Sequence, residues 1–162
     1  MLILVYILLF LGWQVSLKWQ NWHTRRWEFG YFFSMVAVTT ASIGILKSQS
    51  AHACPWNMVI PTYDGILWDF SATAGHCFPG GHASSGFALV AGYFVYRMSN
   101  PKRAYFFLIA AVILGLAMGW AQMMRGAHFL SHNLWTGWII WCLNVIGYAL
   151  FSHKLEIEET VL

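Results

Sequence analysis

Charged side chains are the scarcest class of residue in this sequence. Asp, Glu, Lys and Arg make up 9% of the 162 residues, whereas hydrophobic residues make up 59%. A soluble globular domain carries about a quarter charged residues, so the composition excludes that class. The apolar residues gather in long runs that are nearly free of charge, a pattern typical of helices that cross a membrane.

Internal repeats and low-complexity segments are also absent, and the length suits a single domain. No Lys or Arg precedes the first hydrophobic run, and no clear cleavage site of small residues follows it. A secretory signal peptide normally has both features. We therefore expect this run to be retained as a helix, and a cleaved signal peptide is the alternative.

Five hydrophobic runs define the expected fold. They cover residues 1–17, 29–46, 81–98, 104–123 and 130–151, and the third run is short for a membrane span. The sequence thus predicts an all-α polytopic membrane bundle of about five transmembrane helices, folded as one domain over residues 1–162. Residues 48–80 form a long connection rich in Pro, Gly, Asp and Thr, and connections of that length are often functional.

The positive charges are distributed unevenly between the two sides of such a bundle. Seven of the nine Lys and Arg residues fall on the side with residues 18–28, 97–103 and 152–162. Because the more positive side of a membrane protein faces the cytoplasm, the C-terminus is expected there and the long connection outside. We expect an integral protein of the bacterial inner membrane, with its active site facing the periplasm or the outside.

Ionisable and turn-forming residues collect at helix ends on the outer side. They are, in chain order, Lys47, Pro79, Gly80, Gly81, His82, Arg125, His128 and His132. Each has an ordinary explanation when taken alone: a lysine can snorkel, a Pro-Gly turn can begin a helix, and histidines four residues apart can share a helix face. Ionisable residues gathered at one membrane face are nevertheless costly unless they are used.

These residue types suit phosphoryl transfer. Gly80 and Gly81 allow the backbone to approach a ligand closely, and N–H groups at the start of a helix bind anions. Lys47 and Arg125 supply positive charge, and imidazole can act as a nucleophile or a general acid. Because catalysis of phosphoryl transfer is mostly positioning and charge stabilisation, the set indicates that class of reaction.

The order of these residues resembles the type 2 phosphatidic acid phosphatase (PAP2) superfamily of membrane phosphatases. That family has the signatures Lys-x6-Arg-Pro, Pro-Ser-Gly-His and Ser-Arg-x5-His-x3-Asp. The positions that match them in order are Lys47, Pro55, Pro79, Gly81, His82 and His128. The resemblance covers residues 47–135 and implies a helical core that usually has six spans, so we expect the first of these to be missing here.

Several positions depart from the family signatures. They are Cys54 and Gln122 in place of Arg, Gly80 and Ala121 in place of Ser, and His132 in place of Asp. In the family, the Asp orients the nucleophilic His and stabilises its cationic state, whereas His132 brings no negative charge. Arg125 follows Gln122 by three residues on nearly the same helical face, and we hypothesise that it takes over part of the missing arginine's role.

The resemblance also implies roles and partners. His128 is expected to attack phosphorus and form a phosphohistidine, and His82 to protonate the leaving oxygen and then activate water. His132 completes the catalytic set, and the phosphate-binding candidates are Lys47, Gly80, Gly81, Gln122 and Arg125. We expect no metal or other cofactor and no nucleic acid. The expected partners are the bilayer and a lipid such as undecaprenyl pyrophosphate, phosphatidylglycerol phosphate, phosphatidic acid or a lipid A phosphate.

Two alternatives stay open. The lost Asp and Arg residues favour a non-catalytic relative that binds a phosphorylated lipid or a partner membrane protein. His128 and His132 also have the His-x3-His spacing of a zinc site. Against zinc, Phe129 stands where a zinc protease has its Glu, and no acidic residue is near.

The cysteines Cys54 and Cys77 both lie in the long connection. A disulfide is allowed in an oxidising compartment, and it would hold Pro55 near Pro79. Two free thiols are the alternative. Cys142 lies in the middle of the last hydrophobic run, where we expect it to serve packing.

Overall fold

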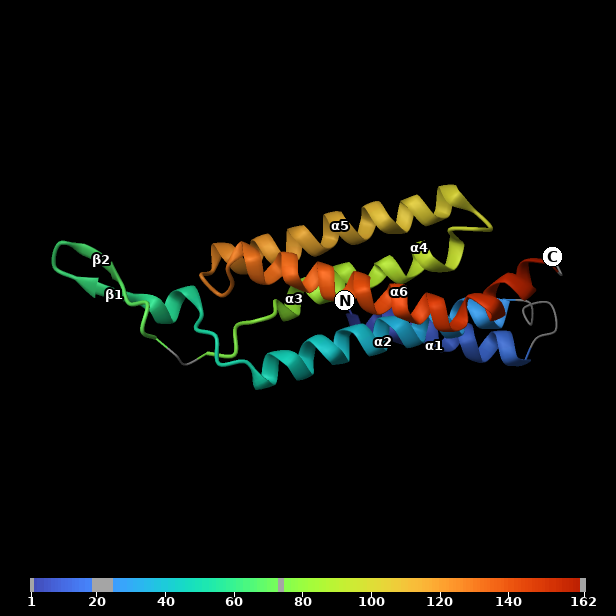
Figure 1. Cartoon of the computed structure of the whole chain (residues 1–162), viewed down its shortest axis with the longest axis horizontal. Coiled ribbons are helices and arrows are strands. Elements are labelled where there is room, and N and C mark those ends of the chain that lie inside the picture. The colour runs from blue at the N-terminus through green and yellow to red at the C-terminus, as the bar shows by residue number, and fades with distance from the viewer. Residues whose placement is uncertain (1, 19–24, 73–74, 161–162) are drawn as a thin grey trace.

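The computed structural model describes residues 2–18, 25–72 and 75–160 (Figure 1). The helices are α1 (Leu2–Lys18), α2 (Arg26–Gln49), α3 (Gly81–Phe87), α4 (Ala91–Tyr96), α5 (Pro101–Met124) and α6 (Leu130–Thr160). The short 3-10 helices are η2 (Pro55–Met58) and η3 (Ala88–Val90), and the strands are β1 (Val59–Thr62) and β2 (Gly65–Trp68).

The expected all-α membrane bundle is confirmed. Each of the five hydrophobic ranges contains helix. Among the described helices, α2, α5 and the part of α6 over Leu130–Leu155 are long and apolar enough to cross a membrane. The third range differs from one continuous helix, because α3, η3 and α4 follow one another there. Its first part, GHASSGF, is rich in Gly and Ser, which are weaker helix formers than Ala or Leu.

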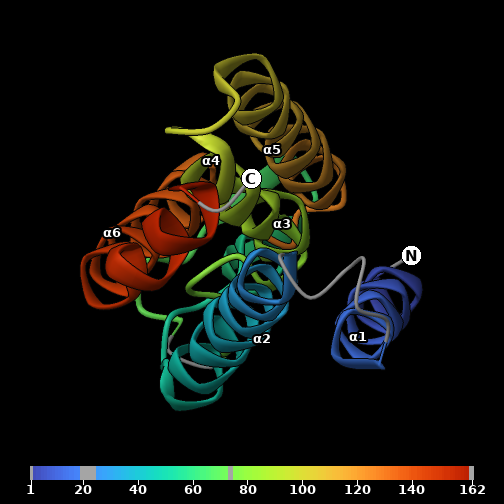
Figure 2. The same cartoon turned by 90° about the vertical axis from the view of Figure 1, so that its right-hand side faces the viewer.

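The chain from α3 to α4 forms the centre of the bundle. Figure 2 shows α2, α5 and α6 around it, with α1 standing to one side next to α2. A Cβ on Gly86 would collide with the backbone of Gly115, and one on Gly92 would collide with the Phe107 ring. Small residues let membrane helices approach each other closely, and here they bring the central segment against α5.

Polar groups in the core bond to the helix backbone. The Thr39 hydroxyl donates to Met35 O at 2.7 Å, and Asn144 Nδ2 donates to Ile140 O at 2.9 Å. The Tyr31 hydroxyl crosses from α2 to α6 and donates to Asn144 O at 3.2 Å. Since a bilayer core offers no water to polar groups, such internal bonds are what lets these residues stay buried.

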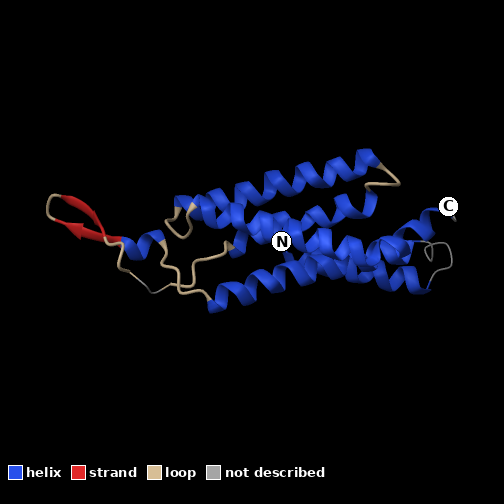
Figure 3. Ribbon diagram, in the orientation of Figure 1, coloured by secondary structure: helices blue, strands red, loops and turns tan. Residues whose placement is uncertain are grey.

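The long connection contains a hairpin that the sequence analysis did not predict. β1 and β2 pair antiparallel, with Thr62 opposite Gly65 (Figure 3). The physical signal was present in the sequence, because apolar and β-branched residues flank an Asp-Gly turn. Gly65 has φ +137°, a conformation that other residues rarely adopt.

Candidate active site

The residues of the predicted site come together at one end of the bundle. Lys47 lies in the last turn of α2, Gly81 and His82 begin α3, and His132 lies in the first turn of α6. His128 lies in the short connection between α5 and α6. Figure 1 shows these helix ends side by side, at the end of the bundle from which the β1–β2 hairpin projects.

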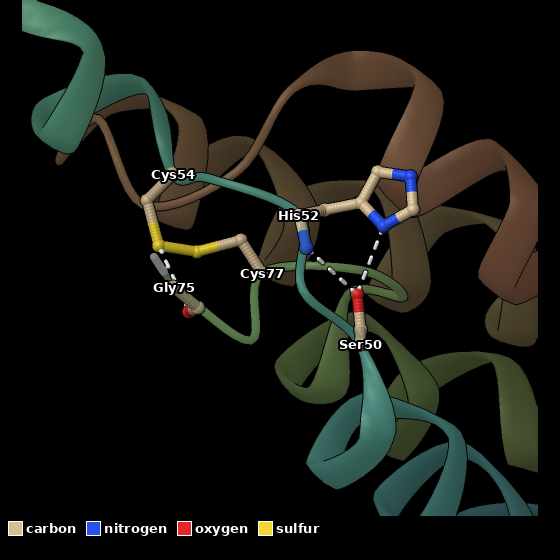
Figure 4. The surroundings of a disulfide bond; sticks show 5 residues. All are labelled: Ser50, His52, Cys54, Gly75 and Cys77. Atoms are coloured by element: carbon tan, nitrogen blue, oxygen red, sulfur yellow. Dashed lines mark hydrogen bonds between the residues drawn. A yellow bond between two sulfur atoms is a disulfide. The ribbon is translucent and has the colours of Figure 1, made fainter. Parts of the chain in front are cut away.

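A disulfide between Cys54 and Cys77 ties the surrounding loops together (Figure 4). Their Cα atoms are 5.2 Å apart, and the two residues are 23 positions apart in the sequence. Beside the disulfide, Cys77 N donates to His52 O at 3.0 Å. Trp56 N donates to Gly126 O at 3.0 Å, which joins the same loop to the connection that carries His128. Three separate segments of chain are thereby fixed around the histidines.

Thr136 fixes the turn at Gly80 and Gly81, called the glycine turn below, against α6. Gly80 N donates to Thr136 Oγ1 at 2.8 Å, and the Thr136 hydroxyl can donate to His132 O at 2.8 Å or to Gly80 O at 3.3 Å. Gly80 N also lies 3.3 Å from His132 O. The N–H of Gly80 is therefore occupied within the protein, whereas the first-turn N–H groups of α3 that follow it have no acceptor within the helix.

His128 is buried and electrically neutral at physiological pH. Only 4% of its surface is exposed. Burial is the main cause that lowers the pKa of His128 to about 4, and the positive charge of Lys47 is the second. A backbone hydrogen bond with Cys77 partly opposes the shift. The charges that His132 and His82 can carry act in the same direction. A neutral imidazole has a free lone pair, which is the form that attacks phosphorus.

Lys47 runs along the glycine turn. A Cβ on Gly81 would lie 3.4 Å from Lys47 Cδ and 3.9 Å from Lys47 Nζ. The absence of a side chain at Gly81 therefore leaves room for the lysine to reach the start of α3. Its charge lies near enough to His128 to affect that residue's pKa. The site consequently holds a cation near a neutral imidazole.

His132 lies beside His128 without bonding to it through Nδ1. The two ring centroids are 6.0 Å apart, and Nδ1 of each ring is buried with no hydrogen-bond partner among the described residues. The Phe78 ring packs edge-on against His132 at 5.5 Å. His132, which stands where the family signature has Asp, therefore makes no hydrogen bond to Nδ1 of His128.

The two remaining candidates are Gln122 in α5 and Arg125 directly after it. Gln122 is half-buried, and its backbone oxygen accepts from Ala127 N at 2.9 Å. Arg125 follows the last residue of α5, is exposed and makes no ion pair with a described residue. Among the described residues, no hydrogen bond joins either side chain to the buried histidines, and Arg125 is exposed near the end of α5.

Sequence reasoning missed three residues that contribute to this site. His52 packs against Phe78 at 5.1 Å and His132 at 6.3 Å, and its Nδ1 lies 3.0 Å from Ser50 Oγ. Thr136 lies one turn after His132, a spacing that could have identified it. Asn133 is buried against Gly80 and Gly119, with both polar side-chain atoms unpartnered among the described residues. No local pattern distinguishes it.

Two apolar cavities open beside the site between α5 and α6. Their volumes are about 320 and 340 Å³, and Leu116 lines both. The second is also lined by Trp120, Leu130 and Asn133, so it reaches the residue next to His132. The two cavities share Leu116 and lie along α5 and α6.

The zinc alternative requires at least three ligand side chains close together. Within the described part of the chain, no three His, Cys, Asp or Glu side chains are grouped closely enough to hold an ion. His128 and His132 have zinc-like spacing in the sequence, but they belong to no such group among the described residues.

Comparison with known proteins identifies the family of this chain. The model of the PAP2 superfamily matches residues 28–155, so this chain belongs to the PAP2 superfamily. The chain is 34% identical over 76 residues to a lipid A 4'-phosphatase of Francisella tularensis subsp. novicida. That match spans 47% of this chain and 33% of the relative, so the chain corresponds to only part of the relative's length. No solved structure matches the chain.

Proposed function

We propose that this protein is a membrane phosphatase that hydrolyses a phosphate monoester or pyrophosphate of a lipid through a phosphohistidine at His128. The supporting observation is the neutral, buried His128 with Lys47 beside it, at the start of α3. Family membership and the lipid A 4'-phosphatase relative support the lipid phosphatase class. The uneven distribution of Lys and Arg supports placing the site at the extracytoplasmic face.

In the first step, a ring nitrogen of His128 forms a bond to phosphorus as the bond from phosphorus to the lipid oxygen breaks. His82 gives a proton to that oxygen, and the lipid alcohol or phosphate leaves. In the second step, His82 takes a proton from water, the water oxygen bonds to phosphorus, and the N–P bond breaks. His128 returns to its neutral form, and inorganic phosphate departs.

The phosphate charge is held by Lys47 and by the first-turn N–H groups of α3. The two glycines of the turn have different roles. The N–H of Gly80 donates to Thr136 and sets the position of the turn. Gly81 leaves space for the lysine. Arg125 supports the phosphate from the mouth, and His52 adds a polar group there. Such fixed donors stabilise the charge that develops on the phosphoryl oxygens.

The hydrophobic part of the lipid lies in the cavities between α5 and α6. These are lined by apolar side chains and end beside Asn133. A lipid that enters from the side would place its phosphate at the histidines while its chain stays in contact with helices α5 and α6. This arrangement favours lipids over small soluble phosphates.

A second candidate function is binding of a phosphorylated lipid without hydrolysis. The unbonded Nδ1 atoms of His128 and His132 favour it, because the nucleophile then lacks the partner that would stabilise its cationic state. The two functions share a ligand and differ in whether the P–O bond breaks.

The experiment measures phosphate release by purified protein in detergent. The substrates are lipid A, phosphatidic acid, phosphatidylglycerol phosphate and undecaprenyl pyrophosphate. His128→Ala removes the nucleophile, and His153→Ala is the matched control at the opposite end of α6. We expect release by the parent and the control but not by His128→Ala. Binding of a lipid without release by any of the three proteins would instead support the second candidate.

A further inference from the structure

A third cavity lies at the opposite end of the bundle from the histidines. Its volume is about 460 Å³, which is within the range of ligand-binding pockets. It is bounded by α1, the first turns of α2 and the C-terminal part of α6, and the apolar lining includes Trp13, Leu17, Tyr31, Met35, Phe151 and Leu155. It shares no lining residue with the candidate active site.

The cavity exists because α1 packs on α2 and stands away from the rest of the bundle (Figure 2). The Trp13 ring stacks on Phe33 with centroids 6.4 Å apart, which joins the two helices along one wall. Tyr31 forms part of the floor, and its hydroxyl is already bonded to Asn144 O. The interior is therefore almost wholly apolar.

Two exposed cations line the same cavity. The guanidinium of Arg26 lies 5.7 Å from the centre of the Trp27 ring, and Lys154 Nζ lies 5.6 Å from it. Cations at this distance from an aromatic ring are held by the ring's electrostatic field. The described residues that line the cavity include no Asp or Glu.

We propose that this cavity binds an anionic phospholipid of the bilayer. The acyl chain fills the apolar space between α1, α2 and α6, and the phosphate contacts Arg26 and Lys154 beside Trp27. Basic pockets between transmembrane helices bind anionic lipid head groups for this reason. The site is separate from the phosphatase proposal, and the lipid would pack against α1, which otherwise packs mainly on α2.

The test uses the full-length protein in mild detergent and measures bound lipid by native mass spectrometry. The probes are dioleoyl phosphatidylglycerol and dioleoyl phosphatidylcholine, which have the same chains. We expect the parent to retain phosphatidylglycerol at least tenfold better. Replacing both cations, Arg26→Gln with Lys154→Gln, should abolish that preference. The matched control, Lys102→Gln with Arg103→Gln, removes two charges at the start of α5 and should keep it.

A third variant tests the apolar part of the site without changing charge. Ser34→Trp fills the cavity from α2 and should reduce retention of both lipids several-fold in protein that still elutes as a folded species. Glycerol 3-phosphate, which has no chain, should not displace phosphatidylglycerol. Equal retention of the two lipids by the parent, equal losses in the two double variants, unchanged binding in Ser34→Trp, or displacement by glycerol 3-phosphate would each overturn the proposal.

Discussion

The two ends of the bundle present positive charge in different ways. At the histidine end, Lys47 lies half-buried against Gly81 and acts on a buried imidazole. At the opposite end, Arg26 and Lys154 are exposed and rest on the face of Trp27. A cation that shares a buried site is positioned to stabilise a reacting phosphate, whereas exposed cations beside a tryptophan are typical of a membrane interface.

Removing the cation at the histidine end should have the largest effect. We expect Lys47→Met to lower kcat/KM for a lipid phosphate by at least about 100-fold, because a fixed charge on the phosphoryl oxygens is lost. Steady-state phosphate release measures this. Lys154→Met at the opposite end is the control and should change kcat/KM by no more than about twofold. Similar losses in both variants would remove the distinction between the two ends.

Opening the disulfide should loosen one end only. We expect Cys54→Ser with Cys77→Ser to reduce activity about tenfold, because the disulfide no longer connects the segment that carries His52 to the segment that leads into the glycine turn. For a loop closed over 23 residues, the chain-entropy model gives a loss of roughly 3 kcal/mol in the free energy of unfolding. Activity and the thermal midpoint are both measured, with Cys142→Ser as the control. Unchanged activity in the double variant would show that the loops do not depend on the disulfide.

Blocking the cavities between α5 and α6 should affect only lipid substrates. We expect Leu116→Trp to lower kcat/KM for a lipid phosphate about fivefold while hydrolysis of para-nitrophenyl phosphate stays within twofold, since a pocket contact of this size contributes about 1 kcal/mol. Ile113→Trp, an exposed position on α5 that lines neither cavity, is the control. Equal losses on both substrates would show that the cavities do not hold the lipid.

The last prediction concerns stability rather than activity, namely its dependence on pH. The pKa of His128 is about 4 in the folded protein and roughly 6.5 in an unfolded chain. The unfolded state therefore takes up a proton first as the pH falls. The stability that depends on neutral His128 is complete above about pH 6.5 and is lost as the pH falls toward 4, by about 2 to 3 kcal/mol.

Thermal midpoints in detergent at pH 7 and pH 4.5 measure this dependence. The parent should lose more stability on acidification than His128→Gln, and His153→Gln should behave as the parent. If His128→Gln and the parent lose the same stability, the imidazole of His128 is not protected from protonation as proposed.

Hydrophobic runs and helix-end residues were enough to predict the bundle and the position of the candidate site. Spans can be predicted because a bilayer demands long apolar helices, and Lys47, His82 and His128 stood at their ends. The contacts that organise the site could not be predicted in the same way. The bond between Gly80 and Thr136 joins residues 56 positions apart, and only the folded chain brings them together.

Other features were missed for different reasons. Asn133 looks like any polar residue in a span until its packing against Gly80 and Gly119 is known. The β1–β2 hairpin had a local signal in its Asp-Gly turn, but it lies within a connection that hydrophobicity alone marks as a loop. The cavity at Arg26 and Lys154 depends on how α1 is placed beside α2, which no short motif encodes.

The most direct test of the central claim is to look for phosphate on His128. The parent protein is mixed with a lipid phosphate labelled with phosphorus-32, quenched in alkali within milliseconds to seconds, digested and analysed by mass spectrometry. The account predicts an acid-labile, alkali-stable phosphoryl group on His128 that appears before free phosphate and is absent from His128→Ala. Steady release of phosphate by a protein whose His128 never becomes labelled, or by His128→Ala itself, would contradict it.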